Sequence, residues 1–176
     1  MNILNFRKSA NNQTYLTVSV LGKSLKLNIK YTSISSIELN KKDYEIDLFL
    51  PKIYKNKENI DVINLAIQKL YSSIAETEIE YAMEVARHIL KFAPEDYSIQ
   101  RLNNNEFYKC IKKQIIINPD IVRFNREKIN TTIIQAFCKI KHRPNSIAYK
   151  ELLNNAMNNY EIYKKKENKI KLLRVS

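Results

Sequence analysis

Residues 133–150, with the sequence IIQAFCKIKHRPNSIAYK, set the architecture expected for the second half of the chain. Apolar residues recur at every third or fourth position before Arg143, which is the spacing of an amphipathic helix. Pro144 stops that helix, because proline lacks a backbone N–H and clashes with the preceding turn. Asn145 or Ser146 can then cap a second helix. The stretch therefore predicts two helices separated by a short polar turn.

A much longer helix is expected earlier in the chain, over residues 59–92. Apolar residues keep helical spacing throughout this span, and neither Pro nor Gly interrupts it before Ala93-Pro94. A single long helix is the first prediction. A break near Ser72-Ser73 is the alternative.

Two β-rich regions flank the long helix. Short alternating runs with polar turns are typical of half-buried strands. The first region predicts an antiparallel meander with strands at residues 15–20, 25–31, 35–39 and 44–50. The second predicts a small sheet with strands at residues 97–102, 106–111 and 114–117, followed by a helix that Asn125 can cap.

These elements predict an α+β fold with an N-terminal antiparallel β-meander, one long helix, and a small sheet with two C-terminal helices. The expected boundaries are a loose N-terminus at 1–13, a single domain at 14–163 and a basic tail at 164–176 that frays. Within the domain, residues 14–51 form the meander, 59–92 the long helix and 97–163 the C-terminal part.

Composition excludes several classes of protein. The 176 residues include one glycine, so neither the P-loop nor the dinucleotide-binding glycine motif can be built. The two cysteines do not make a disulfide framework. No apolar run approaches the roughly 20 residues that span a bilayer, and no signal peptide is evident at the start. We therefore expect a cytoplasmic protein with no membrane contact.

Several segments keep the order and spacing of one known family. They are Leu21-Gly22-Lys23 before a strand, Leu70-Tyr71 in the long helix, Arg101-Leu102, the run ending at Asn118, and residues 135–150 without a gap. On these segments the chain resembles the YgjP-like metallopeptidases, zinc hydrolases related to the SprT and WLM groups. The resemblance covers roughly residues 18–163 and implies a zincin-like C-terminal half.

The resemblance also implies that the zinc chemistry is lost. Gln135, Lys139 and Asn145 stand where the family has its three zinc-binding histidines, and Ala136 stands where it has the general-base glutamate. Residues 106–109 replace the family's Trp-Gly-Ser-Cys segment. Amide side chains are poor zinc ligands and an ammonium repels the ion. We therefore expect a degenerate member without the HExxH motif, a pseudoenzyme with no catalytic residue and no cofactor.

The function expected from this comparison is binding or scaffolding through the former active-site cleft, with an unknown protein or peptide as partner. Five residues around the helix break are the candidates for binding: Lys139, His142, Arg143, Tyr108 and Tyr149. One alternative is a residual metal-dependent hydrolase that holds zinc through other ligands. The net charge of +12 supports a second alternative, a basic nucleic-acid-associated protein with non-specific polyanion contact. A lysine-rich composition of the whole chain would produce the same charge.

Cys138 and His142 lie at i and i+4 of the predicted helix, so they can share one face. A thiol–imidazole pair is one interpretation, and half of a metal site with Cys110 is another. A buried thiol beside a surface histidine is the simpler interpretation. His88 stands alone on the long helix and is expected at the surface.

Overall fold

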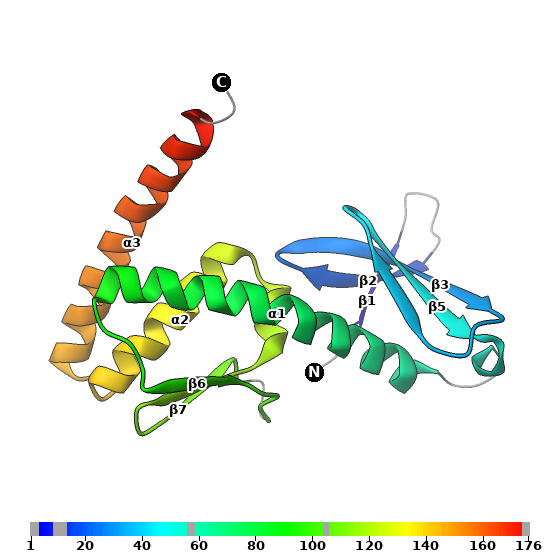
Figure 1. The fold of residues 1–176 in the computed structure, drawn as a ribbon, viewed down its shortest axis with the longest axis horizontal. Coiled ribbons are helices and arrows are strands. Elements are labelled where there is room, and N and C mark those ends of the chain that lie inside the picture. The colour runs from blue at the N-terminus through cyan, green and yellow to red at the C-terminus, as the bar shows by residue number, and fades with distance from the viewer. Residues whose placement is uncertain (1–3, 9–13, 56–58, 104–105, 174–176) are drawn as a thin grey trace. The chain divides into compact units, whose positions relative to one another are not determined.

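The chain folds as two compact units that share one long helix (Figure 1). The computed structural model describes residues 4–8, 14–55, 59–103 and 106–173. Unit 1 comprises residues 1–77 and 119–126, and unit 2 comprises residues 78–118 and 127–176. The sequence predicts one domain over residues 14–163, whereas the contacts divide the chain within α1 (Ile60–Leu90). The expected α+β layout of sheet, long helix, small sheet and two helices is confirmed.

Unit 1 contains a five-stranded sheet in the order β1-β2-β3-β5-β4. Its strands are β1 (Leu4–Lys8), β2 (Thr14–Val20), β3 (Lys23–Thr32), β4 (Glu38–Lys41) and β5 (Glu45–Pro51). A short 3-10 helix, η1 (Lys52–Tyr54), follows the last strand.

Two expectations for this sheet are wrong. Residues 4–8 are not a loose start, because all five pair with β2, from Leu4 opposite Val18 onward. The sheet is also not a purely antiparallel meander, because β3 and β5 run parallel. The cause is the position of β4, which pairs antiparallel with β5 and lies at the edge beyond it. Residues 1–3 and 9–13 of the expected loose segment lie outside the described residues.

The two faces of β5 have opposite character. Ile46, Leu48 and Leu50 are fully buried, as expected for alternate residues that face a core. Asp47 lies between them on the other face and is only 3% exposed, because polar side chains cover it. Its carboxylate lies 3.1 Å from Lys30 Nζ and 2.8 Å from Lys42 Nζ, and it accepts a hydrogen bond from Asn28, so this buried charge is paired. We call Asp47 with these three partners the Asp47 cluster.

Helix α1 is continuous, and the alternative of a break at Ser72-Ser73 is wrong. The Ser72 hydroxyl donates to the Gln68 carbonyl within the helix, so it leaves the helical path intact. Tyr71 is fully buried and its hydroxyl donates to the Ser19 carbonyl at 2.8 Å, which fixes this helix on the sheet of unit 1. Ile60 has the spacing of the core face but is 46% exposed, because it is the first residue of the helix.

Gly22 in the β2–β3 turn holds the segment that precedes α2. Its φ of 78° lies in the left-handed region that suits glycine. The backbone N–H groups of Leu21 and Gly22 donate to the carbonyls of Val122 and Arg123 at 2.7 and 3.2 Å. A Cβ atom at position 22 would lie 2.8 Å from Asn125 Cβ, which is too close. Only glycine therefore satisfies both the turn and the approach of residues 119–126.

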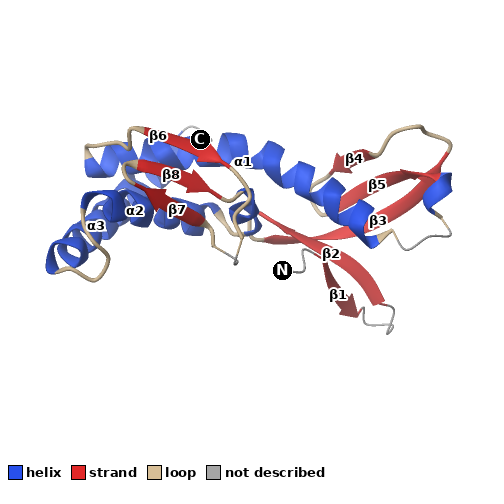
Figure 2. Cartoon of the chain, turned by 90° about the horizontal axis from the view of Figure 1, so that it is seen from below, coloured by secondary structure: helices blue, strands red, loops and turns tan. Residues whose placement is uncertain are grey.

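Unit 2 contains a three-stranded sheet and two helices (Figure 2). Its strands, in the order β6-β8-β7, are β6 (Asp96–Ile99), β7 (Tyr108–Ile111) and β8 (Gln114–Ile117). The 3-10 helix η2 (Pro119–Arg123) leads to α2 (Arg126–Lys141), and α3 (Ile147–Leu173) follows the break. Asn125 directly precedes α2, at the position predicted for its cap.

The expectation that residues 164–176 form a frayed tail is wrong for most of its length. Helix α3 continues to Leu173, and residues 174–176 lie outside the described residues. Lys164 pairs with Glu127 at 2.9 Å and with Glu161 at 3.0 Å. Glu161 belongs to α3 itself, whereas Glu127 lies on α2, and the Tyr81 hydroxyl of α1 donates to Glu167 at 3.0 Å. Two tertiary contacts therefore fall within the segment expected to fray. No helix in the described part of the chain has both the length and the apolar content required to cross a bilayer.

Replacing Gly22 with Ala should destabilise the protein by about 2 kcal/mol, because alanine is strained at positive φ and its methyl group meets Asn125. We expect the melting temperature to fall by roughly 4–8 °C in thermal unfolding followed by circular dichroism. The exposed neighbour Ser24 provides the control, since Ser24→Ala should leave the melting temperature nearly unchanged. Equal melting temperatures for Gly22→Ala and the wild type would contradict the close approach of Asn125.

Replacing Asp47 with Asn should flatten the acid dependence of stability. Hydrogen bonds from Lys42, Lys30 and Asn28 hold the pKa of Asp47 well below its usual range. A depressed folded-state pKa contributes stability above the unfolded-state value of about 3.9, and this contribution is lost as the pH falls further. Wild-type stability should therefore drop between about pH 5 and about pH 2 more steeply than that of Asp47→Asn. Urea unfolding at several pH values measures this, with the exposed Asp43→Asn as the control. Parallel pH profiles for Asp47→Asn and the wild type would contradict the role of the cluster.

Candidate functional site

The predicted break between two helices is confirmed, and its capping residue is Ser146. Helix α2 ends at Lys141 and α3 begins at Ile147. The Tyr149 N–H donates to Ser146 Oγ at 3.1 Å, which is the bond of an N-cap residue. Asn145, the other candidate for the cap, has a φ of 68° in the turn. The turn therefore fixes where Tyr149 enters α3.

The four positions that the resemblance singles out differ in exposure. Gln135 is half-buried and Lys139 is exposed one turn later, so helical spacing puts both on one side of α2. Ala136 is fully buried. Asn145 is exposed in the turn, and within the described residues its side chain forms no hydrogen bond with the other three. Gln135 and Lys139 therefore share one side of α2. No hydrogen bond links Asn145 to either of them within the described residues.

Lys139 has an aromatic partner on the neighbouring sheet. Its ammonium lies 4.8 Å from the ring centroid of Tyr108 on β7, a cation–π distance. In the described part of the chain, no carboxylate lies within ion-pair distance of Lys139. An aromatic ring orients a cation without neutralising it. Lys139 therefore keeps its positive charge available to an anion.

Phenols and thiols surround this contact. Tyr108, Cys110, Cys138, Tyr149 and Lys139 form what we call the Lys139 cluster, because they affect one another electrostatically. Burial raises the pKa of Tyr108, and Tyr149 and the two cysteines raise it further. Burial likewise raises the pKa of Tyr149. Both phenols therefore stay protonated near neutral pH and can donate hydrogen bonds.

The thiols of this cluster are not activated nucleophiles. Cys138 is fully buried, and burial raises the pKa of its thiol to about 11. Burial also raises the pKa of Cys110, although the Lys139 ammonium opposes the shift. The Cys110 thiol lies 3.5 Å from the Ala136 carbonyl, to which it donates. A reactive cysteine needs a lowered pKa, so the thiol–imidazole interpretation of Cys138 and His142 loses its chemical basis.

The remaining predicted binding residues lie at the end of α2. His142 is half-buried and Arg143 is exposed. The His142 backbone N–H donates to the Cys138 carbonyl at 3.0 Å, as in one further helical turn, but within the described ranges neither side chain forms a hydrogen bond or ion pair with the Lys139 cluster. Lys141 lies 5.7 Å from the centroid of Phe92. In the same ranges, no three residues of the types His, Cys, Asp and Glu gather as metal ligands would.

A second basic site lies in unit 2 where none was predicted. A hollow of about 280 Å³ is lined by His88, Ile89, Lys91, Asn159, Ile162, Tyr163 and Lys166. The His88 and Tyr163 rings are 5.6 Å apart with a 52° tilt, and no acidic residue lines the hollow. The spacing of Asn159, Tyr163 and Lys166 is helical and could have revealed this face. It was missed because the tail was expected to fray from residue 164.

Comparison of the chain with known proteins gives no match: neither the family models, nor the curated proteins, nor the solved structures contain a similar one. The Lys139 cluster and the basic hollow must therefore be interpreted from their own chemistry.

Proposed function

We propose that the protein is a non-catalytic binding protein that holds an anionic group of a protein or peptide partner beside Lys139. The proposal depends on one observation, the exposed ammonium of Lys139 over the Tyr108 ring without a carboxylate partner in the described part of the chain. A carboxylate is the anionic group that every protein partner carries. The cluster then acts as a docking point and not as a centre of hydrolysis.

The chemistry of the neighbouring side chains supports binding over catalysis. Ala136 carries no group that can transfer a proton, and the amide of Gln135 neither ionises nor binds zinc well. Tyr108 and Tyr149 stay protonated because burial raises the pKa of both phenols, so their hydroxyls remain able to donate hydrogen bonds. One fixed cation with neutral donors around it is suited to holding a carboxylate in place.

The resemblance to the YgjP-like metallopeptidases gives this arrangement a simple origin. Those enzymes hold Zn²⁺ at the position that corresponds to Lys139. An ammonium there supplies a permanent positive charge where a metal once supplied it. We propose that the chain is a degenerate relative that keeps a site for anionic groups without the metal.

The site is expected to act as one contact within a larger interface. Two unit charges 4 Å apart attract by about 1 kcal/mol in water and by about 4 kcal/mol near a protein surface. The Tyr108 ring attracts the ammonium by roughly 0.5–1 kcal/mol, which orients it but is present with or without an anion. An isolated carboxylate would therefore bind weakly, and most of the affinity would come from the rest of the partner.

Replacing Lys139 with Met should abolish a preference for acidic peptides at this site. We expect an acetylated tetraglutamate peptide to shift the amide resonances of Tyr108, Cys110 and Lys139 in two-dimensional NMR, and a tetraglutamine peptide to leave them in place. Lys139→Met should weaken this binding by roughly tenfold, which corresponds to about 1.4 kcal/mol.

Lys150→Met removes an exposed charge from α3 and is the matched control, expected to retain the response. Unchanged binding by Lys139→Met, with unchanged melting temperature, would contradict the proposal.

Zinc content of the purified protein tests the alternative of a residual hydrolase. One equivalent of zinc per chain would favour that alternative.

A nucleic-acid-binding function is the second candidate, and the basic hollow in unit 2 favours it. Lys91 and Lys166 supply two cations, and His88 and Tyr163 supply rings on which a base can stack. The net charge of +12 would increase the rate of such encounters. Contacts of this kind would be independent of nucleotide sequence.

Salt titration of single-stranded DNA binding tests this second candidate. Each phosphate contact adds about 0.7 to the slope of log affinity against log salt for single strands. The double variant Lys91→Met with Lys166→Met should therefore lower the slope by about 1.4 in fluorescence anisotropy. The exposed pair Lys52→Met with Lys55→Met in unit 1 is the control. Equal slopes for the two double variants would exclude the hollow as a phosphate-binding site.

A further inference from the structure

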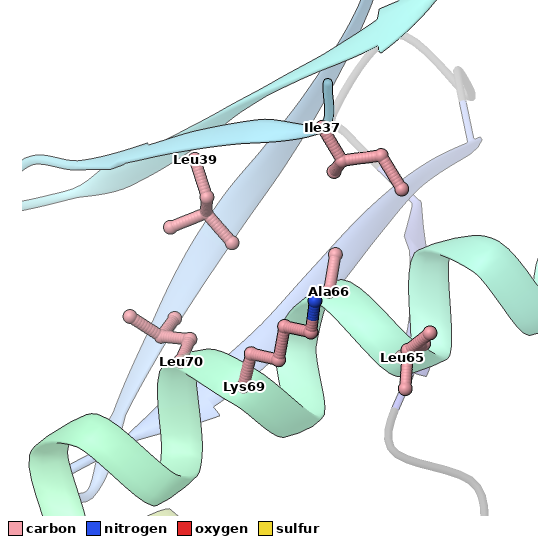
Figure 3. Close-up of a pocket in the computed structure, with 6 residues that line it drawn as sticks. All are labelled: Ile37, Leu39, Leu65, Ala66, Lys69 and Leu70. Carbon is pink, nitrogen blue, oxygen red and sulfur yellow. The ribbon is translucent and has the colours of Figure 1, made fainter.

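An apolar groove lies in unit 1, far in sequence from the Lys139 cluster (Figure 3). It has a volume of about 230 Å³ and is lined by Ile37, Leu39, Leu65, Ala66, Lys69 and Leu70. One wall is the chain entering strand β4 and the other is the first half of α1. All six residues belong to unit 1, so the groove is a feature of one compact unit.

Strand β4 forms an open edge beside this groove. It is the last strand in the sheet order, and its one neighbouring strand in the described part of the chain is β5. The Lys42 N–H donates to the Glu45 carbonyl at 2.8 Å, and Asn40 lies opposite Asp47. Alternate residues of an antiparallel pair bond to the partner strand. The backbone groups of Leu39 and Lys41 therefore face outward, where another strand can add.

The exposed aliphatic side chains on the two walls of the groove lie close together. Ile37 is 37% exposed and Leu65 is 51% exposed. Single exposed aliphatic residues are ordinary, but here they lie with Leu39 and Leu70 around one hollow. An aliphatic side chain from outside would bury apolar surface on both walls at once.

Lys69 gives the groove a charge. Figure 3 shows its side chain running along α1 so that the ammonium ends over Ala66, toward Ile37. No acidic residue lines the groove, and Lys69 has no ion-pair partner in the described part of the chain. A carboxylate placed there would meet a cation at the border of an apolar surface.

We propose that β4 and α1 form a docking groove for an extended peptide segment of a partner protein. The segment adds to the outer edge of β4, places an aliphatic side chain between Leu39 and Leu65, and sets a carboxylate against Lys69. Strand addition obtains affinity from main-chain hydrogen bonds and specificity from pockets for alternate side chains, and both components are present here. This site is independent of the Lys139 cluster.

A second copy of the chain fits the groove less well than an acidic segment does. Each copy carries a net charge of +12 and would bring further lysines, including Lys41 of its own β4, to the shared edge. Like charges placed opposite one another oppose such pairing. The charge of the groove therefore favours a partner segment that contains Asp, Glu or a chain terminus.

Selection from a displayed library of random peptides of about seven residues tests the proposal on the full chain. We expect enriched peptides to carry aliphatic residues at alternate positions together with a carboxylate. In fluorescence anisotropy, Leu65→Asp should weaken the best peptide at least tenfold, and the milder Leu65→Ser should weaken it less. Lys69→Met should weaken the acidic peptide about tenfold and leave its amide-substituted counterpart unchanged.

Three controls separate this site from other surfaces. Ile53→Asp changes another exposed aliphatic residue of unit 1, Lys52→Met removes another exposed charge, and Lys139→Met alters the cluster in unit 2; all three should bind the peptide as the wild type does. Failure to enrich any peptide, or enriched peptides that bind Leu65→Asp and Leu65→Ser as well as wild type, would overturn the proposal. A dimer in light scattering that Leu65→Asp dissociates would also overturn it, in favour of self-association.

Discussion

The close approach of Gly22 to Asn125 is the constraint that holds the segment leading into α2 within unit 1. Residues 119–126 follow strand β8 but pack within unit 1, so the chain passes between the units at 77/78, 118/119 and 126/127. The turn at Gly22 binds this segment by donating two backbone hydrogen bonds to it. Because Gly22 has no Cβ, the segment can approach closely. Asn125 directly precedes α2. The start of the helix that carries Lys139 is therefore fixed by a turn more than one hundred residues earlier.

Elements with local signals could be predicted from the sequence, and elements that depend on distant partners could not. Helix α1 has uninterrupted apolar spacing, and Pro144 with Ser146 marks the break before α3, so their positions were predictable. Strand β1 exists because it pairs with β2, and α3 continues past residue 164 where Lys164 contacts Glu127 of α2 and Glu167 contacts Tyr81 of α1. The parallel pairing of β3 with β5 likewise depends on β4 occupying the edge. None of these contacts leaves a local pattern.

The same distinction holds for the candidate site. Helical spacing alone puts Gln135 and Lys139 on one side of α2, so their grouping was predictable. The ring beneath Lys139 comes from β7, about 30 residues earlier, and spacing cannot reveal which residue of that strand faces the helix. The full burial of Cys138 also depends on tertiary packing, and it decides against thiol chemistry. Exposure and cross-element contacts thus determine what these residues can do.

The lysines of this chain differ in whether they have an acidic partner. Lysine-rich composition explains the net charge of +12 but not where the cations lie. Lys42 and Lys164 pair with carboxylates, as surface lysines commonly do. Lys139 lies over an aromatic ring and Lys69 in an aliphatic groove, and within the described residues neither has a carboxylate partner. An apolar or aromatic neighbour lowers the local dielectric and strengthens the attraction of a cation for an anion. At these positions, as at Lys141 over Phe92, a carboxylate brought from outside would be attracted more strongly than at a lysine that already has an acidic partner, whatever the origin of the lysine excess.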